Sequence, residues 1–302
     1  MQYLGHPNFL YLQSERFYEL LRGNMRQNLH YCTFYRKGLQ KRLDKLGVKY
    51  DILRGIDGKP NLITFDVDRD SEAGAILLKS IISRPYITNV YSKNELEEAG
   101  FLRIIPLKYD VDITNEDEAL RFSCKKKSLS GLKKYRHEVQ VSPFQVDKKG
   151  INKRNVLHSS TRGPSYIFAT SQFQDMAIKN NVTGIRFIPV TYRDRSGSHQ
   201  AEIFQLIAEQ SFAFEQIAID DFVKVKKCPS CGKPKIIYPS TYELHLKGSA
   251  DNLNKDLYMT EALFGYGIPE PFYFISHRLY MLMKEEKMTR SISFSPVRFQ
   301  DK

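Results

Sequence analysis

Two cysteines in the second half of the chain have the most specific spacing for chemistry. Cys228 and Cys231 stand in the run Cys228-Pro229-Ser230-Cys231-Gly232. In a zinc knuckle of this form, the proline and the glycine let the backbone turn so that both thiolates reach one ion. Tetrahedral zinc needs four ligands, and the chain has no second Cys-x-x-Cys. The remaining ligands would come from Cys32, Cys124, His245 or His277.

Three interpretations of the Cys228 and Cys231 pair stay open. The pair holds a structural zinc ion, or it is a knuckle that has lost its metal, or it is a redox pair. The strand and helix that flank a thioredoxin-like redox pair are not evident here. Since half of the ligand set has no identified source, we expect no metal at this turn, and we expect no other cofactor.

No catalytic residue stands out elsewhere in the chain. The seven histidines form no metalloprotease pattern, and the sequence has neither a GxSxG elbow nor a phosphate-binding glycine loop. Asp66, Asp68 and Asp70 alternate at the end of an expected strand but lack the glycine and the distal glutamate of a calcium loop. We expect these aspartates to face solvent, and the chain to be a binding protein rather than an enzyme.

Positive charge is concentrated in one segment. The formal net charge is +12, and residues 121–160 carry eleven Lys and Arg against one Glu and one Asp. Held together, such charges create a local positive potential that attracts phosphate backbones or acidic protein surfaces. A solvated loop without a partner is the competing interpretation. The expected partner-binding residues are Lys125, Lys126, Lys127, Lys133, Lys134 and Arg136.

Length and composition indicate a globular protein in two parts. The chain has 302 residues and 41% hydrophobic content, enough for one large core or two ordinary ones. We expect a cytoplasmic protein, because no secretory signal or membrane-spanning apolar run is evident. The expected domains are an N-terminal α+β domain at 1–120, a basic linker or loop at 121–162, and a duplicated α+β domain with the Cys-x-x-Cys-Gly turn at 163–302.

Local patterns predict several elements of the first part. A helix capped by Ser14 and ended by Gly23, a basic amphipathic run from Lys37 to Leu46, and a strand over Leu62–Asp68 are expected. Ser92 and Glu95 have capping-box spacing before a short helix. A strand over Leu102–Leu107 follows.

Two distant stretches of the second part end in the same way. Each has an apolar strand, a helical dozen residues, a threonine and a second strand with a late proline, at Ile167–Val190 and Tyr273–Val297. Ser171 and Gln174 have capping-box spacing in the first stretch, and Ser276 is the cap candidate in the second. The apolar faces are Phe173, Met176 and Ala177 in one helix, and Leu279, Leu282 and Met283 in the other. The pattern predicts a duplicated strand-helix-strand unit in an α+β protein.

The second part also resembles a known family. Cys228–Gly232, then Tyr238-Pro239-Ser240, then Phe274-Ile275-Ser276 with its helix and the closing Phe294-Ser295-Pro296-Val297 resemble the double-CXXCG immunity proteins of bacterial polymorphic toxin systems and their relatives. The resemblance covers about residues 166–302. This chain has one CXXCG where that family has two, which weakens the case for metal.

The resemblance implies a cytoplasmic protein that binds and neutralises a cognate toxin domain. A basic immunity protein would suit an acidic toxin surface. The alternative is a nucleic-acid-binding or processing protein, of use in phage defence, that employs the basic segment 121–160. Aromatic residues that could stack on bases would favour this alternative, but the segment contains only Phe122, Tyr135 and Phe144 among its lysines.

Overall fold

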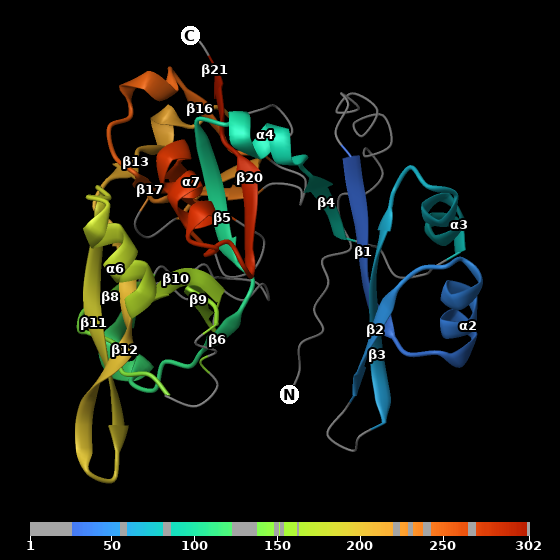
Figure 1. Ribbon diagram of the computed structural model, residues 1–302, viewed down its shortest axis with the longest axis horizontal. Helices are drawn as coiled ribbons and strands as arrows, with labels where there is room; N and C mark the ends of the chain where they lie inside the picture. Colours follow the sequence, from blue (N-terminus) through green and yellow to red (C-terminus); the bar gives the residue numbers. More distant parts are fainter. Residues whose placement is uncertain are drawn as a thin grey trace. The chain divides into compact units, whose positions relative to one another are not determined.

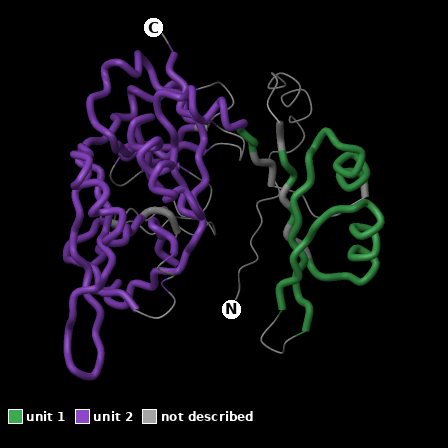
Figure 2. The backbone as a smooth tube through the Cα atoms, viewed as in Figure 1, with its two compact units in different colours: residues 1–91 green, residues 92–302 purple. Residues whose placement is uncertain are grey.

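The chain folds as two compact units (Figure 2). The computed structural model describes residues 26–54, 59–80, 86–122, 138–147, 151, 154–161, 163–219, 224–228, 232–237, 243–264 and 270–300. Unit 1 comprises residues 1–91 and unit 2 residues 92–302, so the division lies before residue 120. The reason is that β5 (Phe101–Pro106) pairs with β19 (Tyr273–Ser276) and β20 (Ile292–Pro296) near the end of the chain.

Unit 1 is a four-stranded antiparallel sheet with two helices on one face (Figure 1). Its strand order is β2-β3-β1-β4, which is the split βαβ arrangement. The elements follow one another as β1 (Arg26–Phe34), α2 (Lys37–Lys45), β2 (Tyr50–Arg54), β3 (Pro60–Asp68), α3 (Glu72–Ser80) and β4 (Tyr86–Val90).

Apolar and polar residues alternate along β3, and the apolar ones mark the buried face of this sheet. Ile63, Phe65 and Val67 pack against the helices, and Tyr31 of β1 stacks on Phe65 with ring centroids 4.8 Å apart. The expected strand at 62–68 and the basic helix from Lys37 are confirmed. Asp66, Asp68 and Asp70 are exposed, as expected. The helix expected after Ser14 lies outside the described residues.

Unit 2 holds two five-stranded sheets, in the orders β11-β12-β10-β9-β6 and β13-β17-β19-β5-β20. The first sheet comprises β6 (Tyr109–Val111), β9 (Leu157–Ser160), β10 (Gly163–Thr170), β11 (Ile185–Asp194) and β12 (Gly197–Ala208). The second adds β13 (Ser211–Phe212) and β17 (Leu257–Thr260) to β5, β19 and β20. β9 lies inside the segment expected as a linker, where all four of its residues are buried and give no alternating pattern.

The two sheets have the same succession of strand directions. Starting from β6 or β13, the next strand is parallel and each further strand is antiparallel to its neighbour. The central pairings also correspond, because Ile167 lies opposite Leu206 in one sheet and Tyr273 opposite Ile104 in the other. Proline occupies a matching place in each outer strand, at Pro189 opposite Phe204 and at Pro296 opposite Leu102.

Both expected strand-helix-strand orders are present. α6 (Ser171–Lys179) joins β10 to β11, and α7 (His277–Glu285) joins β19 to β20. Each helix buries the face expected from sequence, although Leu282 is only partly buried. Ser276 caps α7 by accepting a hydrogen bond from the Leu279 amide at 3.1 Å. The cap expected at Ser171 is wrong, because Thr170 occupies that position and the Ser171 hydroxyl donates to the Glu202 carbonyl instead.

One core joins both sheets to both helices. It contains residues from β5, β9, β10, β12, β17, β19 and β20 as well as α6 and α7. α4 (Lys93–Glu98) packs on it through Leu96, and its capping box of Ser92 and Glu95 is confirmed. The smaller elements are α5 (Glu116–Ala119), β7 (Leu120–Phe122), β8 (Glu138–Gln140), β14 (Lys224–Lys227), β15 (Pro234–Ile237), β16 (His245–Lys247), β18 (Leu263–Phe264) and β21 (Arg298–Gln300).

The described helices are short. The longest have nine residues, and none combines the length and the apolar character that a membrane crossing requires.

Candidate functional site

The Cys-x-x-Cys-Gly sequence connects β14 to β15, and its two ends, Cys228 and Gly232, are described. Cys228 is buried, and its carbonyl accepts a hydrogen bond from the Gly232 amide at 2.9 Å. The Cys228 amide donates to the Lys233 carbonyl at 2.9 Å, and Gly232 has a φ of +71°, a conformation that favours glycine. Cys231 lies outside the described residues, so its approach to Cys228 stays a prediction.

The other suggested zinc ligands do not complete a site among the described residues. Cys124 is outside them, and only the backbone of Cys32 is described, on β1 of unit 1. On β16, the Nδ1 atom of His245 lies 2.9 Å from the side-chain nitrogen Nε2 of Gln300, and His277 is the first residue of α7. Within the described parts of the chain, no three His, Cys, Asp or Glu side chains are grouped as metal ligands. The described residues therefore supply only part of a four-ligand set.

The expected partner-binding residues also lie outside the described part of the chain. Lys125, Lys126, Lys127, Lys133, Lys134 and Arg136 all belong to residues 123–137. Their role stays a prediction.

A buried histidine forms a polar network that sequence reasoning missed. The His158 side chain is fully buried on β9, with Nδ1 2.7 Å from an Asp110 carboxylate oxygen and Nε2 3.1 Å from the Asn155 carbonyl. The two contacts fix the orientation of the imidazole ring, which is buried and inaccessible to a substrate.

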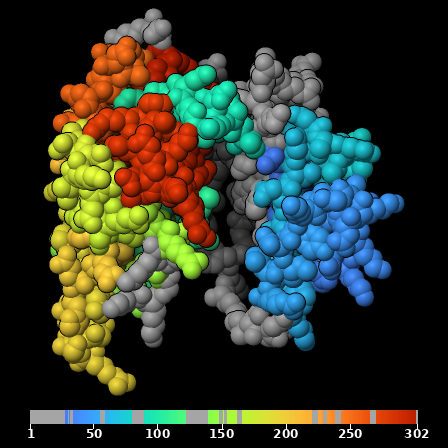
Figure 3. Space-filling model, viewed as in Figure 1, coloured from blue at the N-terminus to red at the C-terminus, as the bar shows by residue number. Residues whose placement is uncertain are grey.

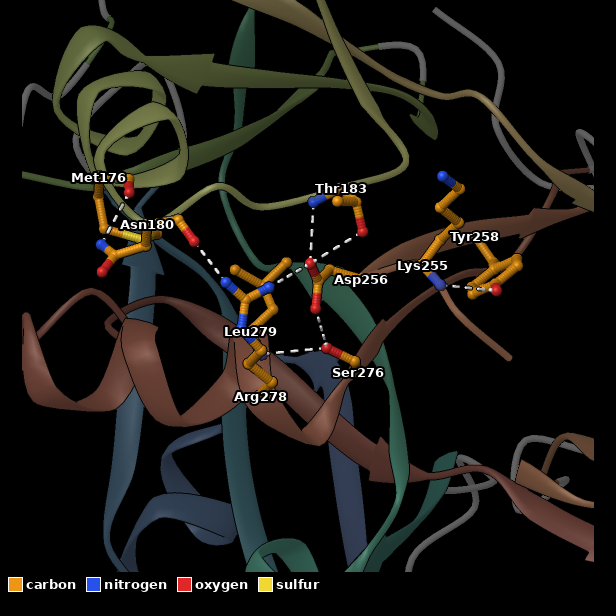
Figure 4. Close-up of polar contacts among 9 residues, drawn as sticks. All are labelled: Met176, Asn180, Thr183, Lys255, Asp256, Tyr258, Ser276, Arg278 and Leu279. Atoms are coloured by element: carbon orange, nitrogen blue, oxygen red, sulfur yellow. Dashed lines mark hydrogen bonds and ion pairs between the residues drawn. The ribbon is translucent and has the colours of Figure 1, made fainter. Parts of the chain in front are cut away.

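Asp256 forms a second network, at the junction of β17, α7 and the loop after α6 (Figure 4). Its carboxylate is buried and accepts hydrogen bonds from the Thr183 amide at 2.8 Å, the Thr183 hydroxyl at 3.2 Å and the Ser276 hydroxyl at 2.7 Å. Arg278 donates to the same carboxylate at 2.7 Å and also bonds the Asn180 carbonyl. A carboxylate that accepts four hydrogen bonds is held in place, so this cluster is a structural clamp.

A third cluster has the composition of a hydrolase triad but not its geometry. Asp194, Ser196 and His199 lie at the turn between β11 and β12. In a triad, the histidine uses one nitrogen for the serine and the other for the aspartate. Here His199 Nε2 meets both Ser196 Oγ, at 2.9 Å, and Asp194 Oδ1, at 3.1 Å. The cluster therefore rigidifies the turn and does not activate the serine.

The fourth candidate is a small cavity between the two five-stranded sheets. Arg103, Glu270 and Tyr273 contribute to its lining. Burial raises the pKa of Glu270 to about 7, against the opposing effect of Arg103. The Arg103 guanidinium carbon lies 3.3 Å from the centroid of the Phe272 ring, a cation-π contact. The cavity holds one titratable carboxylate near neutral pH but is too small to admit a metabolite.

Comparisons with known proteins add no identity to these sites. No protein-family model, no curated protein and no solved structure matches the chain. The function therefore has to be argued from the residues and their arrangement.

Proposed function

We propose that this protein is a bacterial immunity protein that binds and neutralises a cognate polymorphic toxin domain in the cytoplasm. One observation carries the proposal. It is the sequence resemblance of about residues 166–302 to the double-CXXCG immunity proteins. The described residues of that stretch include Cys228 and Gly232, joined by a backbone hydrogen bond, and a Ser276-capped helix followed by a strand that ends at Pro296. The polar networks at His158 and Asp256 act as internal clamps, which suits a rigid binding scaffold.

The charge of the chain supports an acidic partner. Besides the basic segment, α2 and its flanks carry exposed cations that form no ion pair with a described residue: Arg36, Lys37, Lys41, Arg42, Lys45 and Lys49. Clustered cations steer an acidic protein toward its binding surface and raise the association rate.

Nucleic-acid binding is the second candidate function. Lys37, Lys41 and Lys45 recur every four residues and so share one side of α2, which a phosphate backbone could follow. The open face of the same sheet weighs against it, because Asp51, Asp66 and Asp68 are exposed there and repel phosphates. We therefore place toxin binding first.

Coexpression tests the immunity function. Cells that express the toxin encoded beside this gene should survive only when this chain is present, and the two purified proteins should bind tightly. Charge reversal at Lys125, Lys126, Lys127, Lys133 and Lys134 should slow association in a salt-dependent manner. If those reversals leave toxin binding intact but abolish salt-sensitive binding to RNA or DNA, the nucleic-acid function replaces it. Failure of the wild-type chain to bind or neutralise the toxin sinks the proposal.

We propose that Cys228 and Cys231 form a vestigial knuckle without metal. Elemental analysis of the purified protein should find no zinc. One equivalent of zinc that disappears in a Cys228→Ser, Cys231→Ser variant would overturn this.

We also propose that unit 2 arose by duplication of one series of strands and a helix. In the folded protein, the first strand of each series lies in the sheet of the other series. The first series is β5, β6, β9, β10, α6 and β11, and the second is β12, β13, β17, β19, α7 and β20. β12 of the second series lies between β10 and β11 of the first, while β5 of the first lies between β19 and β20 of the second.

Matching backbone hydrogen bonds outside the strands support the duplication. Four contacts recur in the two series, each at a corresponding place. In each contact the amide of the first residue donates to the carbonyl of the second. The corresponding contacts are Leu107 to Ser291 with Glu209 to Gly184; Thr161 to Val111 with Glu261 to Phe212; Thr170 to Val156 with Ser276 to Asp256; and Val182 to Ala177 with Met288 to Met283. Each helix is also followed by a residue with positive φ, Asn181 at +50° and Lys287 at +57°.

A further inference from the structure

The strand pair β11 and β12 extends beyond the sheet to which it belongs. β10 covers β12 only at Ile203–Leu206, whereas β12 continues to pair with β11 as far as Asp194 opposite Gly197. The backbone of Thr191 still bonds Phe144 and Val146, so the two-stranded projection, which we term the arm, comprises residues 192–199. Figures 1 and 3 show it reaching out from the rest of unit 2.

The fold of unit 2 does not require the arm. The strand pair β20 and β5 of the other sheet corresponds to β11 and β12. In it, β20 ends at Pro296, the residue that corresponds to Pro189, and β5 begins at Phe101, so this pair has no projection. That sheet is complete without an arm. The arm is thus an addition to one of two otherwise matching strand pairs.

Internal contacts hold the tip of the arm in one conformation. Asp194 accepts hydrogen bonds from the Ser196 amide at 2.8 Å and the Ser196 hydroxyl at 2.6 Å, and these contacts lower its pKa. The Tyr192 and His199 rings stack with centroids 5.4 Å apart. A two-stranded hairpin is only marginally stable by itself in water, so these contacts preorganise a segment that would otherwise be mobile.

The arm presents the side chains that dominate protein interfaces. Arg193 and Arg195 are exposed and form no ion pair with any described residue, whereas Tyr192 is partly buried against the core of unit 2 and supports the base of the arm. Arginine is enriched among residues that carry most of the binding energy at protein interfaces. The Asp194 carboxylate is occupied by the turn, which leaves the two guanidinium groups as the charges offered outward.

We propose that the arm inserts into an acidic cleft of the cognate toxin and anchors the complex through Arg193 and Arg195. This inference rests on the proposed function. A protein cleft fits better than nucleic acid, because two cations would neutralise only about two phosphates, whereas nucleic-acid affinity depends on several. A protein cleft needs only a few well-placed anchors.

Charge reversal on the arm tests the inference in the full-length chain. The probe is the toxin domain encoded beside this gene. Arg193→Glu with Arg195→Glu should weaken its binding at least about 100-fold, a loss typical of two anchoring residues. The control, Lys247→Glu with Arg290→Glu, changes the net charge equally at exposed sites of unit 2 and should cost less than about threefold, as rim charges do. Both variants should unfold at the wild-type temperature.

Tryptic cleavage gives a second readout on the wild-type chain. Free protein should be cut after Arg193 or Arg195, and bound toxin should suppress these cuts. If the arm variant binds as tightly as the control, or toxin leaves the cuts unchanged, the arm is not the anchor while the immunity function stands. If the wild-type chain binds no toxin, the immunity function and this inference both fall.

Discussion

Asp256 accepts hydrogen bonds from both the amide and the hydroxyl of Thr183, a residue 73 positions earlier in the chain. Ser276 donates to the other carboxylate oxygen, and Arg278 donates to the same oxygen as Thr183. The contact ties the loop after α6 to the start of α7. It thereby joins the two strand-helix-strand segments through one buried charge.

Asp256→Ala should therefore be strongly destabilising. The variant leaves the Thr183 amide and two hydroxyls without an acceptor, and we expect a loss of about 3 kcal/mol in the free energy of unfolding. Arg278→Ala should cost about 1 kcal/mol, because the arginine side chain is half exposed. Urea denaturation measures both values, and equal losses in the two variants would contradict the view of Asp256 as the centre of the clamp.

Glu270 should make stability fall as pH rises. Burial raises its pKa from 4.5 to about 7, so between these values the folded protein keeps a proton that the unfolded chain releases. Stability from this group is fully present below about pH 4.5 and is lost as pH rises through about 7. Glu270→Gln should remove that slope and stabilise the protein at pH 8. Thermal unfolding of both proteins across this range checks it, and parallel pH profiles would refute it.

Lys235 should make stability rise with pH, in a higher pH range than that of Glu270. It lies buried on β15 opposite Lys226, and burial, followed by the charge of Lys226, lowers its pKa from 10.5 to about 8. Between these values the unfolded chain holds a proton that the folded protein lacks, so stability rises with pH from about 8 to 10.5. Lys235→Met should flatten this rise and increase stability at pH 7. An unchanged midpoint in urea at pH 7 would argue against a costly buried charge.

A cut at the tip of the arm should leave unit 2 intact. A protease site placed between Arg195 and Ser196 separates the two series, yet each sheet contains a strand from the other fragment. The nicked protein should elute as one particle and come apart only in denaturant. Fragments that separate in plain buffer would show that the shared strands do not hold the two halves together.

Local signals in the sequence predicted local structure. Alternating apolar and polar residues predicted β3, and the spacing of Ser92 and Glu95 predicted the capping box of α4. Helical periodicity of apolar residues predicted the buried faces of α6 and α7. The cap at Ser171 failed because Ser and Thr stand side by side, and spacing alone does not decide which one begins the helix.

Long-range contacts left no readable pattern. Nothing in the sequence near Phe101 indicates that β5 will pair with strands close to the end of the chain. Asp256 and Thr183 are in contact because the segment before β17 approaches the loop after α6. A single polar residue in a loop belongs to no periodic pattern, so the sequence could not predict this contact. The network at the hairpin tip from Arg193 to His199 depends on side-chain directions that only the fold defines.

The position of β5 also constrains how the protein is made. During translation β5 leaves the ribosome long before β19 and β20, the two strands that flank it in the finished sheet. Its apolar residues Phe101, Leu102 and Ile104 stay without their final partners until synthesis is almost complete. Nascent chains with such exposed strands are prone to aggregate, so this protein should depend on chaperones more than a chain whose sheets form in order of synthesis.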